Sequence, residues 1–356
     1  MKVLALRCSP RGEGQSKSTL MLRHLTEGMR AAGANVEEVD LRKKTVKNCI
    51  GCFTCWTKTP GVCIHKDDMT NELFAKWLEA DLVIYATPLY HFLMTATMKA
   101  FVERTLPVLQ PFFDDQEGRT FHPLRHKHPR FAILCVAGFP EDTVFDQLSS
   151  WAQSVYGPHG LVAAEIYRAN AEVLTNPALK DKADAILEAT RKAGQELVEV
   201  GEVSAETMAE IKQEIVEDRD MWKTLGNLFW KTCISESVTP KEFQEKKIVP
   251  RPDSIKTFLL IMSMGFNPEN AGDTEAVLQF RFTGEEEGLC FIEIKNAKVS
   301  VFEGQADEPT LTVDAPFEVW MDIMAGKLDG QQAFMDGKYK VSGDLALLTR
   351  MNELFG

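Results

Sequence analysis

The chain has 356 residues, which exceeds the usual size of a single domain and predicts at least two. Hydrophobic residues make up 44% and charged residues 26%, a composition that excludes disordered and low-complexity proteins. The net charge of -12 argues against binding to nucleic acid or to an anionic membrane surface.

The sequence also argues against secretion and membrane insertion. The apolar run from Val3 to Leu6 is too short for a signal peptide. No run of about 18 uncharged apolar residues is present, so no membrane span is predicted. We therefore expect a cytoplasmic protein.

The first half of the chain alternates apolar runs with helical patterns. Lys2 to Arg7 predicts a strand, and apolar residues at helical spacing from near Ser16 to Gly33 predict a helix. Further strands are predicted at 36–41, 81–86, 131–136 and 160–167, and helices from 67 and at 94–106, 141–156 and 179–197. This alternation predicts an α/β fold with a doubly wound, five-stranded parallel sheet, whose ligand site lies beyond the carboxyl ends of the strands.

The loop after the first predicted strand has the composition of a phosphate site. Its polar side chains are Ser9, Arg11, Gln15, Ser16, Ser18 and Thr19. Hydroxyls and the N–H groups of a helix N-terminus donate to a phosphate, and arginine adds positive charge. The loop lacks the triphosphate and dinucleotide patterns, which favours a monophosphate. The alternative is a solvated turn with an ordinary helix cap.

Apolar and aromatic residues follow the third and fourth predicted strands, where a sheet edge normally meets water. They are Thr87, Pro88, Leu89, Tyr90 and Phe92 after the third strand, and Ala137, Gly138 and Phe139 after the fourth. A flat aromatic ligand would explain these turns. An apolar contact with a second copy or another domain would explain them equally well.

These motifs resemble the NADPH-dependent FMN reductase family over residues 1 to 200. The resemblance is carried by Ser9-Pro10-Arg11 with Ser16, by Thr87-Pro88-Leu89-Tyr90, and by Lys99 with Glu103-Arg104. It implies a flavodoxin-like fold, FMN and NAD(P)H as cofactors, and a homodimer. The first loop would hold the FMN phosphate and the two turns would flank the isoalloxazine. Gln15 departs from the asparagine frequent in the family, which leaves the register of the loop open.

Four of the eight cysteines lie in one short segment with the spacing C-x2-C-x2-C-x7-C. They are Cys49, Cys52, Cys55 and Cys63. The first three match the run with which bacterial ferredoxins bind a cluster. The segment resembles iron-sulfur flavoproteins, a branch of the same family, which implies that these four cysteines ligate a four-iron four-sulfur cluster. Redox-active thiols or a disulfide remain alternatives, and zinc is disfavoured because its sites usually use two separated cysteine pairs.

The remaining cysteines are isolated in the sequence, and we expect them to be buried small apolar residues. They are Cys8, Cys135, Cys233 and Cys290. The segment from Arg119 to Arg130 holds three histidines between prolines and predicts a polar surface loop. A contact with NADPH phosphates and a histidine metal site are its alternatives.

The last third of the chain has a different pattern. Residues 201–253 predict a charged helical connector and a linker. Strands at 277–282, 290–294 and 299–302 predict an antiparallel meander, followed by strands at 310–313 and 339–341 and helices at 317–325, 330–335 and 344–354. The predicted domains are therefore 1–200, 201–253 and 254–356.

The motifs Ala315-Pro-Phe, Ile323-Met-Ala-Gly-Lys-Leu-Asp and Ser342-Gly-Asp resemble a sterol carrier protein type 2 domain. The resemblance implies an α+β domain whose apolar tunnel takes a lipid or acyl chain. The alternative is an ordinary packed core. The residues concerned are Phe266, Leu278, Phe280, Phe334, Leu348 and Met351.

Together these features predict an FMN-dependent NAD(P)H oxidoreductase that passes electrons to a small-molecule acceptor. This acceptor would be lipophilic if the second domain presents it. No catalytic side chain is assigned, because the flavin carries the chemistry. Two alternatives stay open. One is an iron-sulfur flavoprotein that relays single electrons from ferredoxin, and the other is a lipid carrier with a regulatory flavin domain.

Overall fold

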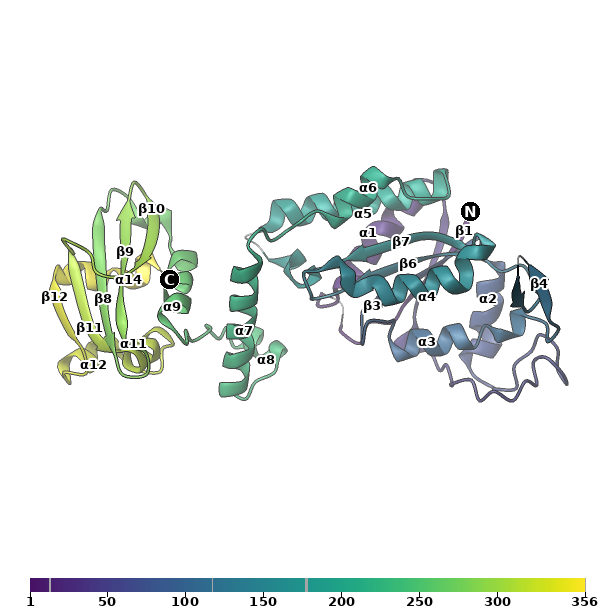
Figure 1. The fold of residues 1–356 in the computed structure, drawn as a ribbon, viewed down its shortest axis with the longest axis horizontal. Helices are drawn as coiled ribbons and strands as arrows, with labels where there is room; N and C mark the ends of the chain where they lie inside the picture. The colour runs from purple at the N-terminus through teal and green to yellow at the C-terminus, as the bar shows by residue number, and fades with distance from the viewer. Residues whose placement is uncertain (13, 117, 177–178, 356) are drawn as a thin grey trace. The chain divides into compact units, whose positions relative to one another are not determined.

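A computed structural model describes residues 1–12, 14–116, 118–176 and 179–355 of the chain. The chain divides into two compact units, Met1–Glu217 and Asp218–Gly356 (Figure 1). The charged region after residue 200 is shared between them. Helix α6 (Ala205–Lys212) belongs to the first unit, and helices α7 (Arg219–Ser235) and α8 (Pro240–Glu245) belong to the second.

The first unit is built on a five-stranded parallel sheet with the order β2-β1-β3-β6-β7. The strands are β1 (Lys2–Arg7), β2 (Asn35–Asp40), β3 (Leu82–Pro88), β6 (Arg130–Val136) and β7 (Val162–Arg168). When these five strands alone are numbered along the chain, their order in the sheet is 2-1-3-4-5, the order of flavodoxin-like folds. β3 and β6 are buried along most of their length, as strands covered on both faces must be. The predicted doubly wound sheet is confirmed.

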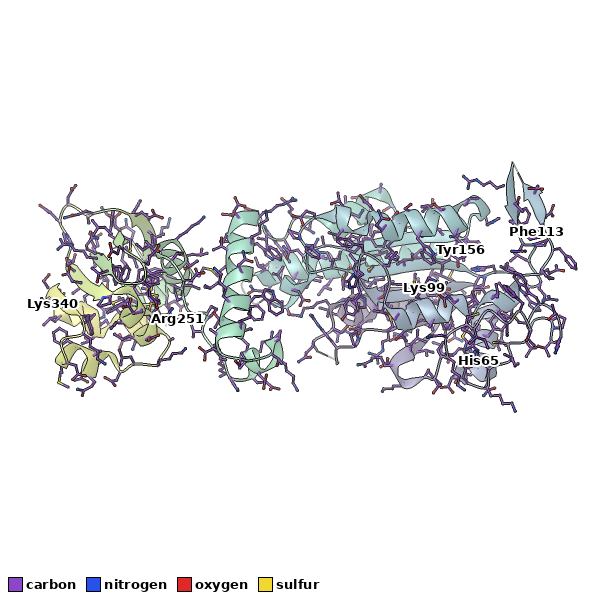
Figure 2. All side chains as sticks on the ribbon, turned by 60° about the horizontal axis from the view of Figure 1, so that its bottom comes forward. His65, Lys99, Phe113, Tyr156, Arg251 and Lys340 are labelled. Carbon is purple, nitrogen blue, oxygen red and sulfur yellow. The ribbon has the colours of Figure 1, made fainter. Side chains whose placement is uncertain are left out.

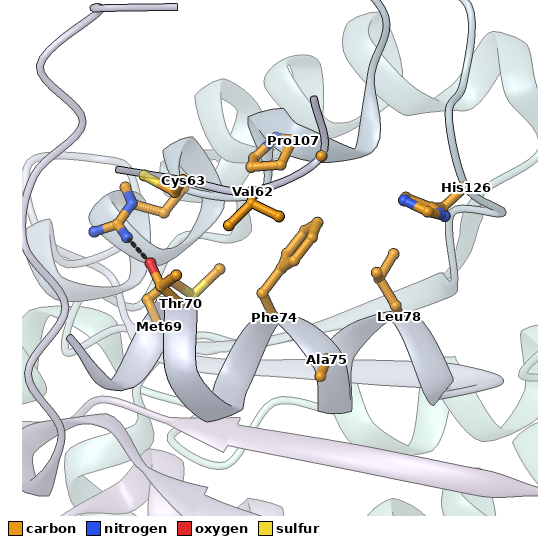
Figure 3. Close-up of a pocket in the computed structure, with 11 residues that line it drawn as sticks. Val62, Cys63, Met69, Thr70, Phe74, Ala75, Leu78, Pro107 and His126 are labelled. Atoms are coloured by element: carbon orange, nitrogen blue, oxygen red, sulfur yellow. Dashed lines mark hydrogen bonds between the residues drawn. The ribbon is translucent and has the colours of Figure 1, made fainter. Parts of the chain in front are cut away.

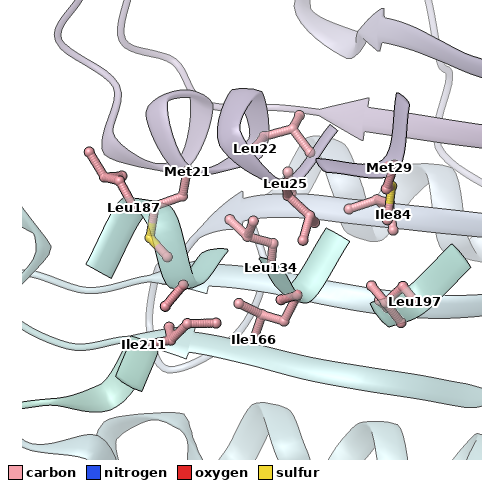
Figure 4. Close-up of a cluster of buried hydrophobic side chains, with 14 of the residues drawn as sticks. Met21, Leu22, Leu25, Met29, Ile84, Leu134, Ile166, Leu187, Leu197 and Ile211 are labelled. Atoms are coloured by element: carbon pink, nitrogen blue, oxygen red, sulfur yellow. The ribbon is translucent and has the colours of Figure 1, made fainter. Parts of the chain in front are cut away.

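Helices cover both faces of this sheet. α1 (Lys17–Ala31), α5 (Lys180–Glu199) and α6 pack on one face, where Figure 4 shows Leu25 and Met29 of α1 near Ile84 of β3. α2 (Phe74–Glu79), α3 (Ala96–Glu103) and α4 (Asp146–Tyr156) pack on the other. Because side chains alternate along a strand, Val3 and Ala5 of β1 enter the first core while Leu4 and Leu6 enter the second.

α1 and α5 approach each other closely, and glycine permits this contact. A Cβ atom on Gly28 would lie 1.8 Å from the carbonyl oxygen of Arg191, and one on Gly194 would lie 2.0 Å from that of Leu25. No side chain fits at either position without moving the helices apart.

Shorter elements connect these helices and strands. A π-helical turn (Met69–Leu73) leads directly into α2, and a 3-10 turn (Asp142–Phe145) leads into α4. Further 3-10 turns lie at Leu41–Lys43, Leu106–Val108, Gly157–His159 and Ala171–Thr175. β4 (Asp114–Gln116) and β5 (Arg119–Phe121) form an antiparallel hairpin.

The histidine-containing segment is more ordered than a polar surface loop. Part of it is strand β5, and His128 is only 7% exposed, with its ring edge-on to Trp77 at 4.6 Å. Burial lowers the pKa of His128, which favours the neutral imidazole. The prediction of a surface loop is therefore wrong for this residue, because its ring completes an aromatic contact of the core.

The second unit holds a five-stranded sheet with the order β10-β9-β8-β11-β12. Its strands are β8 (Ala276–Thr283), β9 (Gly288–Lys295), β10 (Lys298–Glu303), β11 (Leu311–Pro316) and β12 (Lys340–Gly343). The predicted meander is confirmed for the first three. β11 then pairs parallel to β8, and β12 pairs antiparallel to β11.

Helices complete the α+β architecture of this unit. They are α9 (Ile255–Gly265), α10 (Pro268–Ala271), α11 (Phe317–Met324), α12 (Gly330–Met335), α13 (Leu345–Thr349) and α14 (Met351–Leu354). The sequence patterns did not predict α9, which begins with a capping box between Ser254 and Thr257.

The interior of the second unit is rich in aromatic rings. Phe258 of α9 packs edge-on against Phe280 at 5.0 Å and Phe282 at 5.2 Å. Of the predicted core residues, Leu278 and Phe280 are buried, whereas Phe334 is 41% exposed. In the described part of the whole chain, no helix is both long and apolar enough to cross a membrane.

Candidate functional site

Four loops meet at the carboxyl ends of the parallel strands in the first unit. The loop after β1 is joined to the end of β3, since Cys8 N–H donates to the Ala86 carbonyl at 3.3 Å. The turn after β3 is joined to β6, since Leu89 N–H donates to the Val136 carbonyl at 2.9 Å. The segment after β7 closes the group, because Arg11 pairs with Glu172 at 2.6 Å. The structure thus brings the predicted loops together.

The loop after β1 places three buried hydroxyls near the N-terminus of α1. Ser9, Ser16 and Ser18 are each no more than 6% exposed. Ser16 is the N-cap and accepts a hydrogen bond from Thr19 N–H at 3.1 Å, and its hydroxyl lies 3.2 Å from that of Ser18. α1 carries no acidic residue in its first turn, so its positive end is not neutralised there. Glu13 of this loop lies outside the described residues.

Two cations lie beside these hydroxyls. Arg11 and Glu172 are both about half exposed, so their ion pair is weak and could release Arg11 to an anion. Lys17, in the first turn of α1, donates to the Thr175 hydroxyl at 2.8 Å. Burial lowers the pKa of Lys17, the charge of Arg11 lowers it further, and Glu172 opposes both.

The turn after β3 is held in an unusual backbone conformation. Tyr90 and Leu93 exchange two backbone hydrogen bonds, of 2.9 and 3.0 Å, across His91 and Phe92. Both central residues have positive φ, 48° and 61°, which side chains other than glycine rarely adopt. Such strain often accompanies function.

Aromatic rings from two turns lie next to each other at this edge. Phe92 stacks on Phe139, from the turn after β6, with ring centroids 6.4 Å apart and planes inclined by 16°. Tyr90, Phe92 and Phe139 are 46%, 50% and 57% exposed. The predicted aromatic turns therefore form one apolar surface beside the hydroxyl-lined loop.

Asn170, after β7, contributes a group that sequence patterns did not single out. It is only 6% exposed, its φ is 51°, and its N–H donates to the Phe139 carbonyl at 2.6 Å. Its side-chain oxygen is buried and has no hydrogen-bond partner among the described residues. An asparagine after a strand gives no distinctive sequence signal, which explains the omission.

The other predicted residues of this edge differ in exposure. Thr87 and Ala137 are buried, Thr19, Pro88 and Leu89 are half-buried, and Arg11, Gln15 and Gly138 are exposed. Buried hydroxyls at a helix N-terminus, neighbouring cations and an adjacent aromatic surface are the chemistry that FMN requires for its phosphate and its ring. The residues present therefore fit FMN.

The cysteine segment is irregular but well connected. Gly61 N–H donates to the Cys55 carbonyl at 2.9 Å, and Phe53 takes a positive φ of 51°. Burial raises the pKa of the Cys55 thiol, and the charges of Cys63, Cys49 and Cys52 raise it further. Hydrogen bonds from Thr54 lower the pKa of Cys52, which is exposed. Of the four thiols, Cys55 is thus the one whose pKa the other three affect.

A buried ion pair supports this segment. Arg104, which follows α3, donates to both oxygens of Asp67, with Nη1–Oδ2 at 2.7 Å and Nη2–Oδ1 at 3.1 Å. Both side chains are at most 1% exposed. Burial alone would raise the pKa of Asp67, but Arg104 and two backbone N–H groups hold it far below its usual range.

A cavity of about 190 Å³ lies between the cysteine segment and α2. Figure 3 shows Val62 and Pro107 on one side of it and Phe74 and Leu78 on the other, with Cys63 at one end. The remaining lining residues are Gly61, Met69, Thr70, Ala75, Arg104 and His126.

A row of aromatic rings joins the cysteine segment to the β4–β5 hairpin. Successive ring centroids of Phe53, Trp56, His122 and Phe113 lie 5.0, 4.7 and 5.1 Å apart. Phe113 is 78% exposed beside the hairpin (Figure 2). This row anchors the hairpin over the segment.

The described residues do not form a site for a single metal ion. A single zinc needs sulfurs about 2.3 Å from one centre, and no such group of three or more ligands occurs in the described ranges. A four-iron cube spreads its sulfur ligands further apart. All eight cysteines are described as free thiols, and the four isolated ones are buried, as predicted.

Comparisons with known proteins agree with the motifs at both ends of the chain. Residues 1–140 match the NADPH-dependent FMN reductase family, and residues 267–356 match the SCP-2 sterol transfer family. The two expected resemblances are thus confirmed.

Each curated relative matches only part of the chain. An iron-sulfur flavoprotein of Archaeoglobus fulgidus is 38% identical over 107 residues, which cover 30% of this chain and 46% of the relative. One of Methanocaldococcus jannaschii is 34% identical over 108 residues, 30% of this chain and 53% of the relative. Hydroxysteroid dehydrogenase-like protein 2 of Xenopus tropicalis is 32% identical over 105 residues, 28% of this chain and 24% of the relative. The chain spans about half the length of the flavoproteins and a quarter of the dehydrogenase-like protein.

Two solved structures are each similar to part of the chain. The NAD(P)H:quinone oxidoreductase from Methanothermobacter marburgensis covers 55% of this chain and 96% of its own, at 20% identity and a TM-score of 0.41. Sterol carrier protein 2 from Yarrowia lipolytica covers 28% of this chain and 86% of its own, at 17% identity and a TM-score of 0.25.

Proposed function

We propose that the first unit binds FMN and catalyses the oxidation of NAD(P)H, with the electrons passing to a small-molecule acceptor. The observation that carries this proposal is the meeting of buried serine hydroxyls with an exposed aromatic surface at the carboxyl ends of β1, β3 and β6. The family match of residues 1–140 supports it. Bound FMN would supply the redox chemistry, as a hydride acceptor and electron donor.

The protein's own residues would bind and orient the cofactor. Ser16, Ser18 and the N-terminus of α1 would donate to the phosphate, and Arg11 would leave Glu172 to add charge. Tyr90 and Phe92 would cover the ring and exclude water from it. The orphaned oxygen of Asn170 would accept a hydrogen bond from an N–H or O–H of the cofactor.

The test is the absorption spectrum of the purified chain and its response to reductant. We expect flavin bands that bleach when NADPH or NADH is added without oxygen and return with an acceptor. Rates with the two nucleotides decide which one the protein uses. A chain that neither retains nor takes up FMN contradicts the proposal.

An iron-sulfur centre at Cys49, Cys52, Cys55 and Cys63 is a second candidate, which would relay single electrons between ferredoxin and the flavin. The spacing of the four cysteines and the iron-sulfur flavoprotein relatives favour it. Anaerobic reconstitution with iron and sulfide should add a broad absorption shoulder. Cys52→Ala should lose this shoulder and keep the flavin bands, whereas Cys233→Ala, which changes an isolated cysteine, should keep both.

The second unit would bind a lipid or acyl chain and present a lipophilic acceptor, such as a quinone, to the first. The family match of residues 267–356 and the apolar interior around Phe258 and Phe280 support this role. A lipid carrier with a regulatory flavin is the alternative. A chain ending at Glu217 should keep its flavin but reduce hydrophobic acceptors more slowly than the full chain, with equal rates on water-soluble ones. Equal rates on both kinds would contradict acceptor presentation.

The exposed aromatic surface would also bind a second copy of the chain. Tyr90, Phe92 and Phe139 are unusually apolar for a solvated sheet edge. A homodimer would cover them and complete the flavin site. Phe92→Asp should sediment as a monomer. It should also bind flavin more weakly than the wild type.

A further inference from the structure

Arg104 is fixed more firmly than an ordinary structural arginine. It is 2% exposed and donates to Asp67 twice, to the Lys47 carbonyl at 2.7 Å and to the Thr70 hydroxyl at 2.8 Å. These partners lie on both sides of the cysteine segment in the sequence. The guanidinium therefore has little freedom to turn.

One guanidinium nitrogen is left without a partner. Nε of Arg104 is buried and has no hydrogen-bond partner within the described part of the chain. An unmade hydrogen bond of a buried cation is costly, so such a group calls for an explanation.

Of the four clustered cysteines, Cys63 is the one that shares a cavity with Arg104. In Figure 3 Cys63 lies near Thr70, which is hydrogen-bonded to Arg104. A neutral thiol is a weak acceptor, whereas a thiolate is a strong one.

We propose that Arg104 is a positioning residue of the cysteine centre, whose Nε donates to Cys63 once that sulfur ligates a cluster as a thiolate. This inference rests on the proposed iron-sulfur centre. Asp67 holds the guanidinium in place, so the position of the orphaned N–H is fixed before the cluster is assembled. Cys49, Cys52 and Cys55 do not line the cavity that holds Arg104, so Cys63 would be the distinct ligand of the four.

A donor at a ligand sulfur changes the reduction potential. Reduction adds negative charge to the cluster and its sulfurs, and an N–H bond with a positive charge stabilises the reduced state more than the oxidised state. Arg104 should therefore raise the midpoint potential of the centre. A role in packing alone would leave that potential unchanged.

The experiment is a potentiometric titration of the reconstituted full chain, followed by the electron paramagnetic resonance signal of the reduced cluster. Arg104→Gln should titrate at a more negative potential than the wild type, and Arg104→Lys should fall between them. Arg30→Gln, which removes a cation paired with Glu38 away from the cysteines, should match the wild type. A cluster-loaded Arg104→Gln with the wild-type potential overturns the proposal.

Two further measurements keep the outcome interpretable. If Arg104→Gln fails to fold because Asp67 is left as a lone buried charge, Asp67→Asn with Arg104→Gln removes both charges and the N–H donor. This double variant should still titrate at a more negative potential than the wild type, by less than Arg104→Gln alone. A wild-type potential in this double variant would equally overturn the role of Arg104. A wild type that assembles no cluster would instead refute the iron-sulfur centre itself and, with it, this inference.

Discussion

The hydroxyl of Thr95 lies 2.9 Å from the Cys8 sulfur, and this contact ties the start of α3 to the end of β1. Thr95 is also the N-cap of α3, with its hydroxyl accepting from Met98 N–H at 3.4 Å, and its own N–H donates to Thr87. Burial raises the pKa of Cys8 while the hydroxyls of Thr87 and Thr95 lower it. One threonine thus braces two loops of the candidate flavin site.

Thr95→Ala should lower the free energy of unfolding by about 0.5–2 kcal/mol, the usual effect of losing an N-cap. Thr95→Ser keeps the hydroxyl and should lose much less. Urea unfolding of both variants measures the difference. Equal losses would mean that the methyl group of Thr95, and not its hydroxyl, stabilises this edge.

Ser16→Ala should weaken FMN binding as well as the cap of α1. We expect the dissociation constant for FMN to rise about tenfold, which corresponds to about 1.4 kcal/mol. Ser204→Ala is the matched control, since Ser204 caps α6 in the same way but is far from the flavin loops in the sequence. Both variants should lose similar stability, and only Ser16→Ala should lose affinity in fluorescence titrations. A parallel loss of affinity in Ser204→Ala would point to general destabilisation.

The ion pair between Asp67 and Arg104 should make the first unit acid-sensitive. The pKa of Asp67 is lowered in the folded chain, so its stabilisation is complete above the ordinary aspartate pKa and is lost as pH falls below about 4. Asp67→Asn should cost about 3–5 kcal/mol at neutral pH, because Arg104 loses its counter-ion. It should also flatten the acid dependence of urea unfolding. Glu79→Gln, which removes an exposed ion pair with Lys2, should change neither the stability at neutral pH nor its acid dependence.

The contact between α1 and α5 should have no room for even one added methyl group. Gly194→Ala gains helix propensity, yet its Cβ would meet the Leu25 carbonyl at 2.0 Å, so we expect a loss of about 1–3 kcal/mol. Gly226→Ala in α7 has open space around it and should gain up to about 1 kcal/mol. Urea unfolding compares the two. A neutral Gly194→Ala would mean that the helices separate easily.

Elements with strong local patterns were predicted well from the sequence. The strand expected at 131–136 is observed at Arg130–Val136, because apolar runs buried on both faces stand out. α9 was missed because Ile255–Gly265 is apolar on nearly every side and has no polar face to reveal its period. The parallel pairing of β11 with β8 was also missed, because β9 and β10 lie between these two strands in the sequence.

The candidate site was predictable only where its residues are neighbours in the sequence. Ser9, Ser16 and Ser18 share one loop, so their chemistry is visible as a motif. The pairs Asp67–Arg104 and Arg11–Glu172 join residues 37 and 161 positions apart. No periodicity connects such residues, and only the folded sheet brings them together.

The close packing of α1 against α5 also determines when the first unit can fold during synthesis. Met21, Leu25 and Met29 of α1 emerge early from the ribosome, but their cover, which includes Leu187 and Leu197, emerges only near the end of the first unit. Until then, α1 presents an apolar stripe that chaperones or other nascent chains can bind. Contacts this distant in sequence also slow folding. The first unit should therefore fold only after most of its chain has been made, and fragments that stop near residue 140 should aggregate.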